Sequence, residues 1–198
     1  MYRKFSLFLS LNLSLMRPIF LIGFMGSGKS TLGRALGRAT GMQFIDLDTY
    51  IEQRYHANIR DIFASRGEDG FRDLERRMLR EVSEFEDVIV ACGGGTPCFF
   101  DNMEVMNASG TAILLSATHE TLLRRLKAGR RRRPLIASMT DGELSVFIGE
   151  ALDKRMKYYS KAAHTFPADR LESAEQIDET VRLFIDRFLT NDINCLQQ

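Results

Sequence analysis

The sequence has few of the residues that would indicate a secreted, disulfide-linked or zinc-binding protein. It contains only three cysteines and three histidines in 198 residues. The odd number of cysteines and the lack of C-x-x-C spacing argue against a disulfide framework or a zinc site. His56, His119 and His164 are scattered and lack the spacing of metal ligands. We therefore expect a protein of the reducing cytoplasm, without disulfides.

The sequence also lacks a strong charge of one sign and any long apolar run. A formal net charge of +1 gives no overall basic surface, so we expect no nucleic-acid partner. The apolar stretch 5–15 faintly resembles a secretory leader, but polar residues interrupt it and it is too short to cross a membrane. We expect residues 1–15 to be a disordered extension, with Met16 an alternative start, and residues 191–198 to be a tail.

What the sequence does contain is an alternation of apolar runs and amphipathic stretches, which predicts strands connected by helices. The expected strands are residues 19–22, 43–47, 88–91, 111–116 and 164–167. The expected helices are 29–40, a helix from 48 onward, 59–65, 68–85, 118–127, 141–159 and 173–190. Such a chain predicts an α/β fold of three layers, α/β/α, around a mostly parallel five-stranded sheet. We expect one domain, residues 16–190.

The strongest motif lies between the first expected strand and the first expected helix. Residues 23–30 read Gly-Phe-Met-Gly-Ser-Gly-Lys-Ser, a complete G-x-x-x-x-G-K-[ST] phosphate-binding loop. Its backbone N–H groups and the helix N-terminus would bind phosphate oxygens, while Lys29 reaches the β- and γ-phosphates and Ser30 ligates Mg²⁺. An ordinary glycine-rich turn would not require this strand and helix around it. The predicted phosphate-binding residues are Gly26, Ser27, Gly28, Lys29, Ser30 and Thr31.

Two carboxylates stand at the end of the second expected strand. Asp46 and Asp48 are separated by Leu47, so strand alternation would put both on one side of the sheet, at the edge where the phosphate loop opens. One can serve the metal and the other an acceptor hydroxyl. Either aspartate would also suit a helix N-cap. Beside a phosphate loop we favour the functional interpretation.

Two further segments suit an anionic acceptor. Arg72 and Glu75 share a helix face, where the carboxylate can hold the arginine ready for a bidentate bond to a ligand. The glycines 93–95 follow a strand, where backbone N–H groups can approach a ligand closely. The alternatives are a solvated surface pair and a tight turn at the strand exit.

Residues 128–140 lack any periodicity and are rich in arginine, which predicts a mobile lid. A lid arginine that closes over ATP can neutralise the charge that develops on the transferred phosphoryl group. Two or three of the four arginines 130–133 would then be solvated surface residues. A nucleic-acid site is less favoured, because no interleaved aromatic residues accompany the run.

Taken together, the motifs from Met16 to Leu189 resemble the shikimate kinase family, whose fold is that of the nucleoside monophosphate kinase-like P-loop proteins. The resemblance rests on residues 23–31, 46–48, 71–75, 93–95 and 133–136, and on Arg155. The family's lid commonly ends Arg-Pro-Leu-Leu, so Ile136 is a mild departure. The implied reaction is the ATP-dependent phosphorylation of the shikimate 3-hydroxyl in aromatic amino-acid biosynthesis, and the implied molecule is a monomer without a membrane partner.

The resemblance also implies a role for each matched residue on the nucleotide side. Lys29 and Ser30 would bind the phosphates and Mg²⁺, with Asp46 in the outer shell of the metal. Arg133 would act from the lid on the γ-phosphate. Because the spacing of the lid differs from that of relatives, the arginine beside adenine is less well defined, and Arg125 is the candidate.

On the acceptor side, the resemblance implies that Asp48 binds hydroxyls of shikimate and takes the proton of the attacking one. Arg72, Arg155 and the backbone of Gly94 and Gly95 would hold the carboxylate and the ring hydroxyls. The predicted catalytic residues are therefore Lys29, Asp48 and Arg133.

Three other functions are compatible with a phosphate-binding loop. Gluconate kinases and nucleotide kinases lack the joint pattern of two aspartates, arginine–glutamate pair and glycine turn. A GTP-binding switch would require an N/T-K-x-D segment, which the sequence lacks. A non-catalytic relative is disfavoured because Lys29, Ser30, Asp48 and Arg133 are all present.

Overall fold

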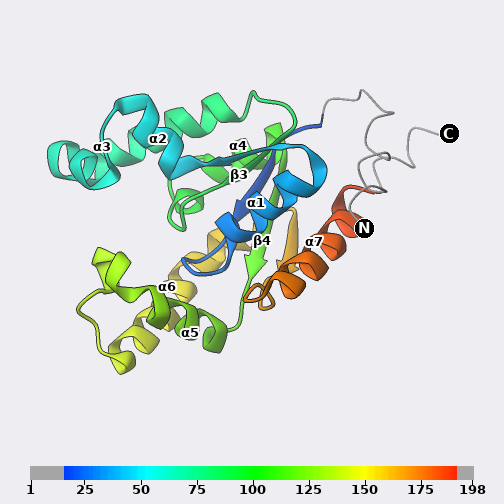
Figure 1. The fold of residues 1–198 in the computed structure, drawn as a ribbon. Coiled ribbons are helices and arrows are strands. Elements are labelled where there is room, and N and C mark those ends of the chain that lie inside the picture. The colour runs from blue at the N-terminus through cyan, green and yellow to red at the C-terminus, as the bar shows by residue number, and fades with distance from the viewer. Residues whose placement is uncertain (1–15, 191–198) are drawn as a thin grey trace.

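The computed structural model describes residues 16–190 and places a parallel sheet at the centre (Figure 1). The five strands are β1 (Ile19–Ile22), β2 (Gln43–Asp46), β3 (Val88–Ala91), β4 (Thr111–Ser116) and β5 (His164–Pro167). Their order is β2-β3-β1-β4-β5, and each pair of neighbours is parallel. The predicted sheet is confirmed and is parallel throughout. The expectations for residues 1–15 and 191–198 lie outside the described residues.

Helices cover both faces of the sheet, as the apolar pattern predicts. The long helices are α1 (Lys29–Thr40), α2 (Leu47–Tyr55), α3 (Ile59–Val82), α4 (Asn102–Ser109), α5 (His119–Gly129), α6 (Asp141–Tyr159) and α7 (Ala174–Phe188). Successive side chains of β1 face opposite ways: Phe20 packs in the cluster that contains Leu79 of α3, and Leu21 in the cluster with Leu36 of α1 and Phe184 of α7. The three-layer α/β/α prediction is therefore confirmed.

Most element boundaries agree with the sequence, and the differences have local causes. The second strand ends at Asp46, because α2 begins at Leu47, one residue earlier than expected. The two helical segments expected on either side of Gly67 form α3, with a break at that glycine (φ 69°, ψ −176°). Asn58 caps α3, since its side chain accepts a hydrogen bond from the Asp61 N–H.

Two segments differ more from the prediction. Helix α4 was not expected, because eight residues are too few to show a helical period. The segment 128–140 is not structureless: α5 continues to Gly129, and two 3₁₀ turns follow, Arg130–Arg132 and Pro134–Ile136. The second turn buries Ile136 against side chains of α5 and α6. The hydrophobic period of the sequence did not predict this packing of Ile136. The mobility of the segment stays a prediction.

The topology gathers the motifs at one edge of the sheet. All strands are parallel, so the phosphate loop after β1, Asp46 at the end of β2 and the glycine turn after β3 meet at their carboxyl ends. Helices α2 and α3 lie on one side of this edge, and α5 and α6 lie on the other (Figure 1). Over residues 16–190, no helix combines the length and apolar character needed to cross a membrane.

Candidate active site

The phosphate loop adopts a conformation that its glycines make possible. Gly26 (φ 82°) and Gly28 (φ 101°) have left-handed backbones, and Gly28 directly precedes α1. The Lys29 ammonium donates to the carbonyls of Gly23 (2.8 Å) and Phe24 (3.0 Å), so its side chain lies back along the loop. Burial lowers the pKa of Lys29 to about 8, although the nearby charges of Asp48 and Asp46 act to raise it. A buried cation at this point suits a phosphate.

Ser30, the loop residue predicted to ligate Mg²⁺, lies beside one of the two aspartates. The hydroxyl of Ser30 donates to Oδ2 of Asp46 at 2.8 Å. A hydroxyl and a carboxylate oxygen are ligands that suit Mg²⁺, which takes few protein ligands and completes its shell with water and phosphate oxygens. Within the part of the chain that the structure describes, no three His, Cys, Asp or Glu residues cluster as a metal site. Ser30 and Asp46 thus fit a magnesium ion that is bound together with a nucleotide.

Asp48 lies in the first turn of α2, so the helix expected from residue 48 onward is confirmed, but strand alternation does not place its carboxylate beside that of Asp46. The two carboxylates nevertheless come close enough to interact. Burial, followed by the charges of Asp46 and Glu75, raises the pKa of Asp48 to about 6, against the opposing effect of Lys29. A Cβ atom on Gly93 would lie 3.4 Å from Oδ1 of Asp48. Asp48 therefore faces the glycine turn with a carboxyl group that titrates close to neutrality.

Arg72 is held by a buried carboxylate, which excludes the solvated surface pair. Its Nη1 donates to Oε2 of Glu75 at 3.0 Å, and the Glu75 side chain is only 1% exposed. Nη2 donates to Glu68 at 3.3 Å, and the guanidinium carbon lies 4.0 Å from the ring centre of Phe99. A guanidinium has five N–H donors. Arg72 is thus oriented by its neighbours and retains donors for a ligand carboxylate.

The glycine turn brings the second predicted arginine to the same place. A Cβ atom on Gly95 would lie 3.0 Å from Nη2 of Arg72, and one on Gly94 would lie 3.2 Å from Nη1 of Arg155. A larger residue at either position would push against a guanidinium. The hydroxyl of Tyr159 also donates to the Gly94 carbonyl at 2.6 Å. Four of the five residues predicted for the acceptor therefore converge from α3, α6 and the turn after β3.

The predicted nucleotide residues line one cleft of about 320 Å³. Its lining residues are Gly26, Gly28, Lys29, Ser30, Thr31, Arg125, Arg133, Leu171 and Glu172. Arg133 of the segment 128–140 thus shares a cleft with the phosphate loop, as a lid arginine should. Ser27 is buried, and no described residue bonds its hydroxyl, so its contribution to phosphate binding would come from the backbone.

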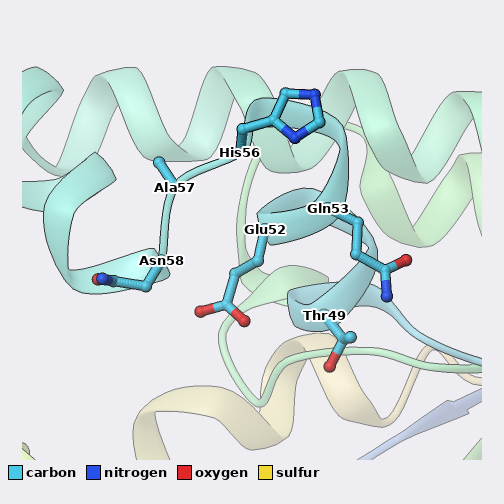
Figure 2. A pocket seen from close by; sticks show the side chains of 6 residues that line it. All are labelled: Thr49, Glu52, Gln53, His56, Ala57 and Asn58. Atoms are coloured by element: carbon cyan, nitrogen blue, oxygen red, sulfur yellow. The ribbon is translucent and has the colours of Figure 1, made fainter.

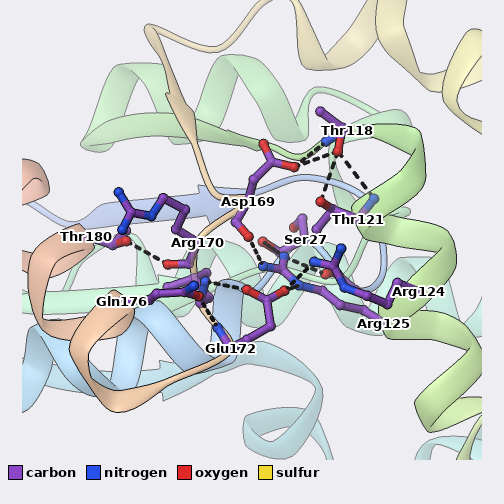
Figure 3. A network of polar contacts seen from close by, with 12 residues as sticks. Ser27, Thr118, Thr121, Arg124, Arg125, Asp169, Arg170, Glu172, Gln176 and Thr180 are labelled. Carbon is purple, nitrogen blue, oxygen red and sulfur yellow. Dashed lines mark hydrogen bonds and ion pairs between the residues drawn. The ribbon is translucent and has the colours of Figure 1, made fainter.

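Arg125 is the centre of a polar network that joins three segments (Figure 3). Its guanidinium donates to Glu172 (2.9 Å), to the Gly26 carbonyl (3.2 Å) and to the Asp169 carbonyl (2.9 Å). Burial would raise the pKa of Glu172, but hydrogen bonds from Arg125 and Arg124 hold that pKa at about 2. Arg125 therefore braces the phosphate loop, and its contact with adenine stays a prediction.

The sequence reasoning missed Asp169 and Glu172. Asp169 accepts hydrogen bonds from the N–H and hydroxyl of Thr118, the N-cap of α5, at 2.8 and 2.7 Å. Both acids follow the last strand, β5, at the edge of the sheet where ligands bind. That position is the signal that would have identified them.

A second hollow, of about 410 Å³, shares no lining residue with the nucleotide cleft (Figure 2). It is lined by Thr49, Glu52, Gln53, His56, Ala57 and Asn58, along α2 and its connection to α3. Glu52 uses one carboxylate oxygen to accept from the Ile59 N–H at 2.9 Å, which caps the start of α3. None of the predicted site residues lines this hollow, so we assign it no part in the chemistry.

Known proteins are similar to this chain over most of its length. The family model for shikimate kinase matches residues 25–185. A shikimate kinase of Phocaeicola vulgatus is 55% identical over 166 residues, which cover 84% of this chain and 95% of that protein.

Solved structures give the same similarity. The crystal structure of a shikimate kinase from Bacteroides thetaiotaomicron has a TM-score of 0.84 at 46% identity and covers 87% of this chain and 98% of that chain. A shikimate kinase from Acinetobacter baumannii in complex with shikimate has a TM-score of 0.75 at 28% identity, with 94% and 97% covered.

Proposed function

Since this chain belongs to the shikimate kinase family, we propose that it transfers the γ-phosphoryl group of ATP to the 3-hydroxyl of shikimate. The products are shikimate 3-phosphate and ADP, and the reaction belongs to aromatic amino-acid biosynthesis. The observation that carries the proposal is the meeting of Arg72 and Arg155 on one glycine turn, next to Asp48 and Lys29. Two arginines beside a carboxyl group suit an acceptor that bears both a carboxylate and hydroxyls.

On the acceptor side, positioning is the main contribution of the protein. Arg72, Arg155 and the backbone of Gly94 and Gly95 hold the carboxylate and the ring hydroxyls of shikimate. Asp48 orients the attacking hydroxyl and accepts its proton. A carboxyl group with a pKa of about 6 suits this task, because it is ionised at neutral pH and still basic.

On the nucleotide side, the protein neutralises charge. The N–H groups of residues 26–31 bind phosphate oxygens, and Lys29 exchanges its bonds to the Gly23 and Phe24 carbonyls for the β- and γ-phosphates. Arg133 approaches the γ-phosphate from the segment 128–140. Ser30 and, through water, Asp46 would hold Mg²⁺, which would offset the negative charge of the phosphates. Arg125 lies on the adenine side.

A coupled assay of ADP release tests the proposed acceptor against its rivals. The full chain is incubated with ATP, Mg²⁺ and one acceptor at a time: shikimate, gluconate or a nucleoside monophosphate. We expect ADP release to depend on shikimate alone. Equal or faster release with gluconate or a nucleotide would assign the chain to another small-molecule kinase. No release with any acceptor would favour a non-catalytic relative.

We also propose that the protein acts as a cytoplasmic monomer through one domain, residues 16–190. The few cysteines, without C-x-x-C spacing, suit a reducing compartment, and a single domain of this size can act alone. Segment 128–140 serves as the lid of that domain.

A further inference from the structure

We propose that Thr96 is a positioning residue of the acceptor site, which orients Arg72 through the buried carboxylate of Glu75. The proposal rests on the proposed function and deepens it, because it adds to the acceptor site a residue that touches neither shikimate nor ATP. It also explains why the turn after β3 continues with a buried threonine.

The contacts form an unbroken chain from Thr96 to Arg72. The Thr96 hydroxyl donates to Oε1 of Glu75 at 2.6 Å, and Oε2 of Glu75 accepts from Arg72 at 3.0 Å. Thr96 is 0% and Glu75 is 1% exposed. The shorter bond has the length of a charge-assisted O–H···O⁻ hydrogen bond. Each oxygen of the buried carboxylate is thus bonded by one of these two side chains.

Thr96 is itself fixed from two directions. It begins the 3₁₀ turn Thr96–Cys98, and its N–H donates to the Gly93 carbonyl at 3.1 Å. Its own carbonyl accepts from the buried side chain of Asn102, the first residue of α4, at 2.8 Å. The side chain is β-branched, which restricts rotation about its first torsion. The hydroxyl is therefore held where the carboxylate of Glu75 needs a donor.

The bond matters because the carboxylate of Glu75 is buried. Without the hydroxyl, Oε1 of Glu75 would be left buried without a donor among the described residues, which is costly for a charged group. The carboxylate would then rotate or draw Arg72 away from the ligand. Glu68 cannot substitute, because its side chain is 61% exposed and such ion pairs bind weakly. The orientation of Arg72 consequently depends on Thr96.

The test replaces Thr96 by valine, which nearly preserves shape and removes the donor. In Thr96→Val we expect the KM for shikimate to rise roughly tenfold to a hundredfold, the range of a hydrogen bond to a charged group. The KM for ATP should stay within about twofold of that of the wild type, and kcat should change less than the shikimate KM. Thr96→Ser restores the hydroxyl and should return the shikimate KM toward the wild-type value.

A matched control and a double variant separate positioning from general damage. The control is Ser83→Ala, which removes another buried hydroxyl. Ser83 caps the C-terminal end of α3, far from the acceptor site, so both KM values should stay unchanged. Combined with Arg72→Ala, Thr96→Val should raise the shikimate KM little further, because the two residues act in one chain. A full additional rise in the double variant, or an equal rise in the KM for ATP, would overturn the proposal.

Failure of the proposed function and failure of the role of Thr96 give different experimental results. If the wild-type chain releases no ADP with shikimate, the proposed function fails, whatever Thr96 does. If Thr96→Val does not fold, Thr96→Cys carries the same test, because a thiol is a weak donor of similar size. We then expect a raised KM for shikimate alone, and an unchanged KM would refute the role of Thr96.

Discussion

At the scale of single residues, Arg72 offers the sharpest separation between the two substrates. Replacing it by alanine removes a charge-assisted contact with the acceptor and leaves Glu75 buried without its partner. We expect shikimate binding to weaken by about 2–4 kcal/mol, as when one member of a buried charge pair is truncated. ATP binding should be nearly unaffected, because Arg72 does not line the nucleotide cleft.

Calorimetric titration with each substrate measures both affinities directly. Arg77→Ala is the matched control, because Arg77 lies on the same helix with an exposed side chain and should leave both affinities unchanged. A loss of ATP affinity as large as the loss of shikimate affinity would show that Arg72 does not bind the acceptor.

The two aspartates predict different responses to the same substitution. Asp48→Asn keeps the shape of the side chain and removes the charge that orients the attacking hydroxyl, so kcat should fall by a factor on the order of 10²–10⁴. Asp46→Asn should instead raise the Mg²⁺ concentration needed for half-maximal activity, because Asp46 bonds Ser30, the proposed metal ligand. Titration of Mg²⁺ against activity distinguishes the two. If excess Mg²⁺ rescued Asp48→Asn but not Asp46→Asn, the roles would be reversed.

The raised pKa of Asp48 predicts a pH dependence. The carboxyl group carries a proton below its pKa of about 6 and is ionised above it. Only the ionised form can accept the proton of the hydroxyl, so kcat/KM should fall as the pH falls through about 6. Rates at concentrations of both substrates far below KM report the free enzyme. The decline should disappear in Asp48→Asn, and its persistence there would assign it to another group.

At the scale of elements, the segment 128–140 contributes Arg133 to the nucleotide cleft. Arg130 bonds Asp141 at 3.0 Å and the Met139 carbonyl, while Arg133 reaches the cleft. If this segment closes over bound substrates, trypsin should cut after residues 130–132 quickly in the free enzyme and markedly more slowly with an ATP analogue and shikimate together. Cleavage sites outside the segment provide the control. Equal rates in both states would exclude closure.

Elements differ in how far the sequence could predict them. The strands were readable because buried strands of a parallel sheet are short apolar runs, as in β1 and β3. Helix α4 could not be predicted, because it has only eight residues. Its buried residues, Asn102, Met103 and Met106, show no clear helical period. The bracing of Arg125 by Glu172 joins residues 47 apart in the chain, and no local pattern records such a contact.

The residues of the candidate site also differ in how far the sequence could predict them. The residues Lys29, Ser30, Arg72 and Arg133 belong to motifs, so each could be named from its neighbours in the sequence. The helix that carries Asp48 was predicted, but the strand alternation used to orient its carboxylate was wrong, because α2 begins at Leu47, directly after β2. Thr96 could not be recognised at all, since its function depends on the burial of Glu75 from another element.

At the scale of the whole molecule, a wholly parallel sheet explains why one edge carries every part of the reaction. The carboxyl ends of β1, β2 and β3 present the phosphate loop, Asp46 and the glycine turn, and α3 and α6 add one arginine each. In the proposed mechanism, nucleotide and acceptor bind at this edge, which brings the γ-phosphate and the hydroxyl together. Positioning of this kind supplies much of the rate enhancement in phosphoryl transfer.

The position of the phosphate on the product tests this arrangement most directly. The full chain is incubated with ATP, Mg²⁺ and shikimate, and the product is examined by NMR that correlates ³¹P with ¹H. We expect phosphorus to couple to the proton on C3 of shikimate, with product formed in equal amount to ADP. A phosphate on another hydroxyl, or ADP released without any phosphorylated shikimate, would contradict the proposed function.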